Sequence, residues 1–156
     1  MIRTILFSLA LLFASVGDVG TWAQAQAQSQ PNEPLSIVTA AGTKLKFQVE
    51  IARNFEEKVQ GLMYRDALAA NAGMLFVYPK ELRQAMWMKN TMIPLDMLFI
   101  RRDGRISHIH ERAVPQSLDT ISSHGRVLAV LELRGGTAAR LGIALGDRVR
   151  HKTFRE

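Results

Sequence analysis

The chain has 156 residues, a formal net charge of +6 at pH 7 and no cysteine. Without cysteine, disulfides, thiolate zinc sites and thiol catalysis are excluded. The length is sufficient for one domain with a substantial hydrophobic core and is short for two domains.

The first 25 residues predict a secretory signal peptide. Arg3 gives a short positive start, and an apolar run covers residues 5–16. Ala23 and Ala25 then supply the small residues of a cleavage site, which predicts a mature N-terminus at Gln26, with cleavage after Ala27 as a second candidate. The apolar run is too short to span a bilayer, because a spanning helix takes roughly 20 residues. We therefore expect an exported protein, periplasmic or extracellular, with no transmembrane segment after cleavage.

Residues 26–34 are rich in Gln, Ala, Ser, Pro and Asn, a composition typical of a disordered leader. We expect a single domain over residues 35–156. It begins with two apolar runs, residues 35–39 and 44–51, that flank the sequence "AAGT". This pattern predicts a hairpin of two strands.

The next element is a short predicted helix. Asn54 and Glu57 have the spacing of a capping box, so the helix should begin after Asn54. Apolar residues recur along one helical face: Phe55, Val59, Leu62 and Met63. Gly61 predicts a close approach of the backbone to a neighbouring segment. A short apolar strand is then expected over residues 73–79, ending at its proline.

Residues 85–91 and 95–102 predict two more strands, separated near Pro94. The Asp-Gly pair at residues 103–104 lies between alternating runs and is a strong hairpin signal, because a type I′ turn needs positive φ at both central positions. We therefore expect residues 95–102 to pair antiparallel with residues 105–114.

Residues 126–133, "RVLAVLEL", predict a buried strand. A second short helix is expected over residues 135–141, ended by Gly142, and a last strand follows a turn at residues 146–147. The total is about seven to nine short strands and two short helices. Because tight turns join the runs, the sequence favours an α+β domain, mainly antiparallel β, built as a compact barrel or sandwich.

The stretch "MWMKNTMIPLDM", residues 86–97, places a lysine, an amide and a carboxylate among apolar side chains. Under a structural interpretation, Asn90, Thr91 and Asp96 satisfy backbone groups that lose their partners at the proline, which cannot donate a ladder hydrogen bond. Asp96 would also pair with Lys89. Under a functional interpretation, Trp87 forms a flat apolar wall of a ligand pocket, with Lys89 and Asn90 as polar contacts.

The functional interpretation defines a candidate pocket for a small ligand or an envelope component. Its candidate ligand-binding residues are Trp87, Lys89, Asn90, Asp96, His110 and Glu111.

Two patterns raise the question of metal binding. His108 and His110 would share one face of a strand and could hold two positions on zinc or copper. Six methionines fall between Met63 and Met97, and thioethers bind Cu(I). A third ligand could be His124 or Asp119, but two histidines alone are too few to hold a metal ion, and methionine commonly fills irregular cores. We therefore expect no bound metal and no cofactor.

Acid–base catalysis has five candidate residues: Asp96, His110, Glu111, Asp119 and Glu132. Glu132 lies inside "VLEL", a predicted buried strand, where burial would raise its pKa unless it were paired. We expect a salt bridge from Glu132 to Arg65 or Lys89. The sequence has no nucleophile-elbow motif and no phosphate-binding loop.

Several segments resemble the domain-of-unknown-function 192 family: "GLMYRDAL", "GMLFVY", "WMKNTMIPLDMLFI", "IHERAVP", "AVLEL" and a later "LGD". The resemblance extends from about residue 35 to residue 149, and residues 87–96 are its most specific part. It implies a small, mainly β single domain, often with a signal peptide. It transfers no activity, because the family has no agreed reaction. Met86 stands where many relatives carry phenylalanine.

The sequence favours a non-catalytic binding or accessory domain of the cell envelope. The alternatives are a small hydrolase acting on envelope polymers and, less favoured, copper or zinc handling. The basic residues are scattered without stacking aromatics among them, which argues against nucleic acid as a partner. Their charge favours weak contact with anionic surfaces.

Overall fold

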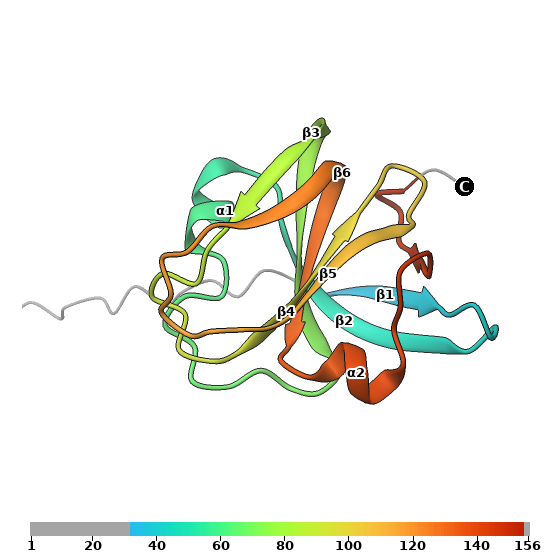
Figure 1. The fold of residues 1–156 in the computed structure, drawn as a ribbon, viewed down its shortest axis with the longest axis horizontal. Coiled ribbons are helices and arrows are strands. Elements are labelled where there is room, and N and C mark those ends of the chain that lie inside the picture. Colours follow the sequence, from blue (N-terminus) through green and yellow to red (C-terminus); the bar gives the residue numbers. More distant parts are fainter. Residues whose placement is uncertain (1–31, 155–156) are drawn as a thin grey trace, which may run out of the picture.

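The computed structural model describes residues 32–154, so the expected signal peptide lies outside the described residues. Within this range, seven strands form one sheet in the order β5-β4-β6-β3-β2-β1-β7 (Figure 1). The sheet curls into a half-barrel, and an isolated bridge between Arg105 and Arg148 joins its two edges. The expected α+β domain, mostly β with two short helices, is confirmed.

The strands are β1 (Glu33–Val38), β2 (Lys44–Ala52), β3 (Ala72–Met86), β4 (Leu95–Ile100), β5 (Ile106–Ala113), β6 (Ile121–Arg134) and β7 (Arg148–Arg150). The helices are α1 (Phe55–Gln60) and α2 (Thr137–Leu141). Every pair of neighbouring strands is antiparallel except β2 and β3, which are parallel. Among the described residues, no helix has the length and apolar character to cross a membrane.

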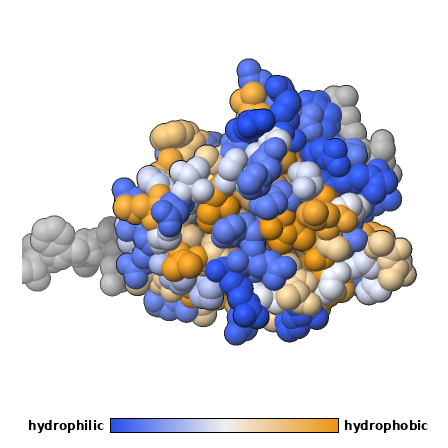
Figure 2. Space-filling view, in the orientation of Figure 1, coloured by the Kyte–Doolittle hydropathy of each residue, from blue (hydrophilic) through white to orange (hydrophobic). Residues whose placement is uncertain are grey.

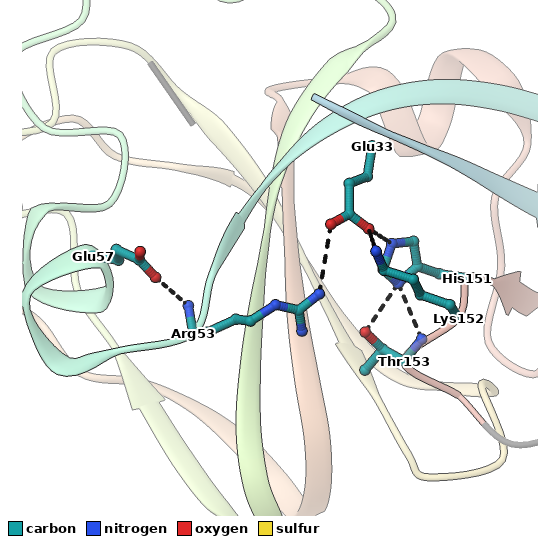
Figure 3. Close-up of polar contacts among 6 residues, drawn as sticks. All are labelled: Glu33, Arg53, Glu57, His151, Lys152 and Thr153. Carbon is teal, nitrogen blue, oxygen red and sulfur yellow. Dashed lines mark hydrogen bonds and ion pairs between the residues drawn. The ribbon is translucent and has the colours of Figure 1, made fainter. Parts of the chain in front are cut away.

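The expected boundary between leader and domain is wrong by two residues, because β1 already begins at Glu33. The Glu33 carboxylate lies 3.0 Å from His151 Nε2 and 2.8 Å from Lys152 Nζ (Figure 3). The Thr153 N–H donates to His151 Nδ1, so the imidazole proton is on Nε2 and points at Glu33. On the other side, Arg53 makes an ion pair with the same carboxylate. These contacts fasten the C-terminal residues to the start of β1.

The predicted end of a strand at Pro79 is wrong, because β3 is continuous from Ala72 to Met86. It pairs with β6 along both halves, with a shift in register between Val77 and Leu82. Such an irregularity leaves backbone positions outside the ladder, where a proline costs no hydrogen bond. The predicted new strand starting at Ala85 is likewise part of β3.

The predicted hairpin between β4 and β5 is confirmed, but its turn is not type I′. Gly104 has a φ of +80°, whereas Asp103 is not among the residues with positive φ. The Gly104 N–H donates to the Arg101 carbonyl, and the Arg101 N–H donates to the Arg105 carbonyl. This pattern is a longer hairpin loop that ends on a left-handed glycine. A Cβ on Gly104 would lie 2.6 Å from the Val149 carbonyl oxygen, so no other residue fits there.

Two hydrophobic clusters lie on opposite faces of the sheet. The first takes residues from all seven strands, among them Leu35, Leu98 and Val149, and fills the half-barrel. The second lies against the outer face of β3, β4 and β6, and the segments after α1 and β3 cover it with Leu62 and Met88. Every residue of β4 is buried, because this strand faces both clusters. Its side chains alternate between the two faces as predicted.

Helix α1 begins after Asn54 with the predicted capping box. Its predicted apolar stripe is only partly in the core: Leu62, just after the helix, is buried, whereas Phe55 and Val59 are exposed. Figure 1 shows α1 on one side of the sheet, away from α2. Figure 2 shows hydrophobic residues at the surface in several separate patches between hydrophilic ones. The exposure of Phe55 and Val59 places them where they can line a surface site.

Candidate functional site

A pocket of about 310 Å³ opens beside α1, over the outer face of the sheet. We call it the α1 pocket. Its lining comes from α1 and the residues after it, from β3 and the loop that follows, and from β6. Four aromatic side chains contribute to the walls: Phe55, Phe76, Tyr78 and Trp87. The charged lining residues are Lys58, Lys89 and Glu132. The volume is at the small end of the range for ligand sites.

The wall formed by α1 is positioned by its two ends. At the start, the Asn54 side chain accepts the Glu57 N–H at 2.8 Å, and the Glu57 carboxylate accepts the Asn54 N–H at 3.0 Å. At the end, Gly61 has a φ of +47° and turns the chain back over the sheet. A Cβ on Gly61 would lie 3.2 Å from the Phe76 ring. The close approach that the sequence predicted at this glycine is therefore confirmed.

A second wall comes from the loop after β3, where the predicted strand over residues 85–91 is wrong beyond Met86. The Met88 N–H donates to the Ser117 carbonyl, and the Thr91 N–H donates to the Met88 carbonyl. The resulting turn buries Met88 completely and leaves Trp87 47% exposed. A neighbouring loop, rather than a paired strand, thus orients the predicted pocket wall.

Each lysine of the α1 pocket lies over an aromatic ring. Lys89 Nζ is 5.2 Å from the Trp87 ring centroid, and Lys58 Nζ is 5.3 Å from that of Tyr78. At these distances the ring quadrupole attracts the ammonium group. Lys58 also donates a hydrogen bond to the Arg53 carbonyl. Burial lowers the pKa of Lys58, and the charge of Glu57 opposes that shift.

Glu132 is the only acid among the lining residues, and it is 4% exposed. No hydrogen bond or ion pair joins its carboxyl to another described residue. Burial raises the pKa of Glu132 to about 8, so the carboxyl is mostly protonated at pH 7. Burial, and then the charge of Glu132, raise the pKa of Tyr78 to about 12. The inner end of the pocket therefore presents neutral O–H groups.

The expected salt bridge to Glu132 is wrong for both proposed partners. Arg65 makes a bidentate pair with Glu50 instead, with N–O distances of 2.5 and 2.7 Å. That pair raises the pKa of Arg65, with burial opposing it. Lys89 rests on Trp87, as described above. With its two predicted partners engaged elsewhere, the Glu132 carboxyl faces the pocket without a counter-charge.

The strand register explains why the Glu132 carboxyl has apolar neighbours. It lies opposite Met97 of β4 on one side and Met74 of β3 on the other. Both methionines are buried. His110 of β5 lies opposite Met97 in turn, so its backbone is two strand spacings, roughly 10 Å, from that of Glu132. Neither His110 nor Glu111 is among the residues that line the α1 pocket.

Asp96, another predicted pocket residue, is fully buried and faces away from the α1 pocket. Its Oδ1 accepts the N–H groups of Arg112 at 2.9 Å and Gly136 at 2.8 Å, and its Oδ2 accepts that of Ala138 at 2.7 Å. Asp96 is therefore a structural residue, but the predicted pairing with Lys89 and with backbone groups at the proline break is wrong for these three hydrogen-bond partners. They lie at the end of β5 and the start of α2, and Lys89 is not among them.

The break at Pro94 is closed by Gly135. The Gly135 N–H donates to the Pro94 carbonyl at 2.8 Å. A Cβ on Gly135 would lie 2.9 Å from Pro94 atoms, so the contact requires glycine. Asp96 therefore has no part in satisfying the backbone at the break.

Asn90 does not line the α1 pocket. It joins the loop after β3 to the segment after α1. Its Nδ2 donates to the Tyr64 Oη at 2.8 Å, and its carbonyl accepts the Tyr64 N–H at 2.9 Å. Both residues have positive φ, 55° for Asn90 and 61° for Tyr64. A bulky residue rarely adopts that conformation, so these two hydrogen bonds hold a strained segment in place.

The histidines pack against aromatic rings. His108 stacks on Phe99 and meets His124 edge-on, with ring centroids 4.4 Å apart in the second pair. Burial lowers the pKa of His108, and the charges of His124 and His110 add to that shift. Among residues 32–154, no group of three or more His, Cys, Asp or Glu is placed to hold a metal ion.

Of the six predicted pocket residues, the structure brings Trp87 and Lys89 together in the α1 pocket. Prediction from sequence missed Lys58 and Tyr78, which carried no local signal. Glu132 was among the residues considered from the sequence, but it was predicted to form a salt bridge. An acid inside an otherwise unbroken apolar strand was the signal that could have found this residue.

Two solved structures are similar to this chain. One, from Sinorhizobium meliloti 1021 and named as a candidate transcription regulator, is 45% identical with a TM-score of 0.79 and covers 81% of this chain and 98% of its own. The other, of unknown function from Novosphingobium aromaticivorans DSM 12444, is 36% identical with a TM-score of 0.77 and covers 86% of this chain and 100% of its own.

No curated protein matches this chain. The family DUF192, described as an uncharacterized ACR, matches residues 36–151. That range covers most of the chain and includes all of β2 to β6, both helices and the lining of the α1 pocket. The protein belongs to the DUF192 family.

Proposed function

We propose that this protein is an exported small-ligand-binding module and that the α1 pocket is its binding site. The observation that carries the proposal is the Glu132 carboxyl, which is buried, unpaired among the described residues and open to the pocket. A polar group that is largely removed from water and has no protein partner costs free energy of folding. A ligand that hydrogen-bonds to this carboxyl would offset part of that cost.

The walls of the α1 pocket support the same function. Ligand sites combine a mostly apolar lining with a few polar groups that set orientation. Here, aromatic side chains form much of the lining, and its polar groups include the ammonium groups of Lys58 and Lys89 and the carboxyl of Glu132. Phe55 and Trp87 are exposed at the surface although both line the pocket. Large exposed apolar side chains gathered around a hollow are typical of a binding site.

Binding is favoured over hydrolysis by the number of acids in the pocket. Hydrolysis of an envelope polysaccharide by the common two-carboxylate mechanism needs a second acid within roughly 10 Å of the first. Glu132 is the only acid among the lining residues, so the α1 pocket has no second acid. Asp96, Glu111 and His110, the other predicted acid–base candidates of this region, are outside the lining.

The binding proposal is tested with a variant that fills the pocket. Ala85→Trp adds a large side chain to the lining, and Ala67→Trp makes the same change at an exposed alanine outside it. A small-molecule library is screened against the wild type by calorimetry, and each hit is repeated with both variants. We expect Ala67→Trp to keep the hits and Ala85→Trp to lose them. Hits that Ala85→Trp retains, or a library without hits, would count against the α1 pocket.

Export is supported by residues 1–25, which combine a positive start, a short apolar run and small residues at the expected cleavage site. The name of the Sinorhizobium protein points instead to transcription, which takes place in the cytoplasm. Cellular location therefore separates the two roles. We expect intact-mass measurement of the native protein from an envelope fraction to give an N-terminus at Gln26. Full-length protein confined to the cytoplasm would overturn export.

A further inference from the structure

The α1 pocket has two chemically different ends, and together they define a class of ligand. At the inner end, Glu132 projects from the middle of the sheet and is almost fully buried. Nearer the surface, Lys58 comes from α1, where it is half-buried, and Lys89 comes from the loop after β3, where it is exposed. This inference rests on the proposed function, because it concerns the ligand of the same pocket.

The lysines are held in the lining rather than extended into solvent. Each ammonium lies about 5 Å from the centre of an aromatic ring that also lines the pocket. Lys58 is fixed further by its hydrogen bond to the Arg53 carbonyl. An ammonium group has three donors, so both lysines keep N–H groups for a ligand. The mouth of the pocket thus presents two positioned cations.

No negative charge in the lining balances these cations at neutral pH. Glu132 is the only acid there, and burial keeps its carboxyl protonated at pH 7. A protonated carboxyl is a hydrogen-bond donor. Tyr78 is neutral as well, and its hydroxyl donates to the Met86 sulfur, a weak acceptor. Of these two hydroxyl groups only that of Glu132 keeps its proton for a ligand, so the inner end is best matched by a ligand atom that accepts.

The same arrangement disfavours a cationic ligand. A carboxylate beneath aromatic walls could hold an amine, because ring faces attract cations. In this pocket the two lysines already lie over the Tyr78 and Trp87 rings. An amine entering the pocket would also meet two like charges at the mouth.

We propose that the α1 pocket binds an amphipathic anion. Its acidic group lies between Lys58 and Lys89, its apolar body lies against the aromatic walls, and an acceptor atom at its far end accepts a hydrogen bond from the Glu132 carboxyl. The ligand class is thus a carboxylic acid with an apolar chain or ring and a distal hydroxyl or carbonyl.

Three probes of equal length test the charge of the ligand: 8-hydroxyoctanoate, 8-amino-1-octanol and 1,8-octanediol. Binding is measured by calorimetry at pH 6.5 with the full-length mature protein. We expect the acid to bind at least about tenfold more tightly than the diol, and the amine to bind most weakly. The double variant K58Q/K89Q should bind acid and diol equally. Neither lysine is buried, so the change should leave the fold intact.

The role of Glu132 is tested by the pH dependence of the same binding. As pH rises from 7 to 9, Glu132 ionises and its charge should weaken binding of the acid about tenfold. Glu132→Gln keeps a neutral donor and should bind the acid with little change over this range. The other titratable groups of the lining are Tyr78, which stays neutral, and the two lysines; His110 and Glu50 lie beyond the flanking methionines.

The outcomes separate this inference from the proposed function. Preference for the amine, or equal binding of all three probes, would overturn the anionic class while leaving the pocket a binding site. An equal fall in affinity with pH in wild type and Glu132→Gln would show that Glu132 does not contact the ligand. That result would overturn the proposed hydrogen bond at the inner end of the pocket. If no probe binds while other library members still do, the anionic class is wrong. If neither probes nor library bind, the proposed function itself fails.

Discussion

Asp96 and Glu132 are two buried acids in neighbouring strands, and they have opposite surroundings. Asp96 of β4 lies opposite Leu133 of β6, the residue next to Glu132, and the two acidic side chains face opposite sides of the sheet. The Asp96 oxygens accept three backbone N–H groups. The Glu132 carboxyl has no partner among the described residues and opens onto the α1 pocket.

The difference shows that burial alone does not assign a role to an acid. Hydrogen bonds from backbone amides stabilise a carboxylate and make it part of the fold, as at Asp96. Burial without such bonds raises the pKa, as at Glu132, and leaves the group available to a ligand. The partners of a buried acid thus separate an element of structure from a candidate site.

The largest effect is expected at Asp96. Asp96→Ala should lower the free energy of unfolding by about 4 kcal/mol, because three buried amides lose their acceptor. Asp96→Asn should lower it by about 2 kcal/mol, because an amide nitrogen cannot accept the Ala138 N–H. Urea denaturation at pH 7 measures both. If Asp96→Ala left the free energy of unfolding almost unchanged, Asp96 would not be a structural residue, and it would no longer differ from Glu132 in this respect.

Glu132 should show the next largest effect, in the pH dependence of stability. The folded protein releases this proton near pH 8 and the unfolded chain near 4.5, so the contribution of Glu132 to stability is full below pH 4.5 and disappears by pH 8. Wild type should therefore lose about 3 kcal/mol relative to Glu132→Gln between pH 5 and pH 7.5. Parallel urea titrations at these pH values give the difference. Equal pH profiles would show that Glu132 is paired after all.

Trp87 tests whether the neighbouring wall is open. Trp87→Ala should cost about 1 kcal/mol, because the side chain is about half-exposed and lines a pocket. Phe99→Ala, at a fully buried aromatic of the second cluster, should cost about 3–5 kcal/mol and serves as the matched control. Denaturant midpoints compare the two. Equal losses of stability in the two variants would show that Trp87 is a core residue and that it does not line an open pocket.

The smallest effect is expected where a carboxylate is paired at the surface. Lys152 contacts Glu33, but its side chain is 69% exposed, so Lys152→Gln should cost about 0.5 kcal/mol or less. The remaining contacts of Glu33, with His151 and Arg53, stay in place (Figure 3). Raising the salt concentration should reduce the effect further. A cost comparable to that of Asp96→Ala would mean that exposure has little bearing on these acids.

The parts of the fold that the sequence predicted correctly depend on neighbouring residues. The hairpin of β1 and β2, the Asn54 capping box and the alternation of β4 all follow from spacing within a few positions. Pro79 illustrates the limit, because its place inside β3 depends on an irregular pairing with β6, about 50 residues further along the chain. Local rules cannot anticipate that partner.

The candidate site shows the same limit more strongly. Trp87 and Lys89 were predicted because an unusual stretch contains both. Lys58 and Tyr78 reach the same pocket from α1 and β3, and only the folded sheet brings them together. Glu132 was predicted to form a salt bridge because burying an unpaired charge costs much free energy, and buried charges are normally paired. It failed because Arg65 is engaged with Glu50 and because the acid is neutral instead.

The exposure of α1 has a consequence for how the site opens. None of the six helical residues is buried, yet this helix forms a wall of the α1 pocket. Its unfolding would expose little of either hydrophobic cluster, so local opening of the helix requires much less free energy than unfolding of the domain. Local opening of α1 would therefore widen the pocket while the half-barrel stays intact. Occupancy of the pocket should then appear as slower hydrogen exchange at the amides of α1, with the strands unchanged.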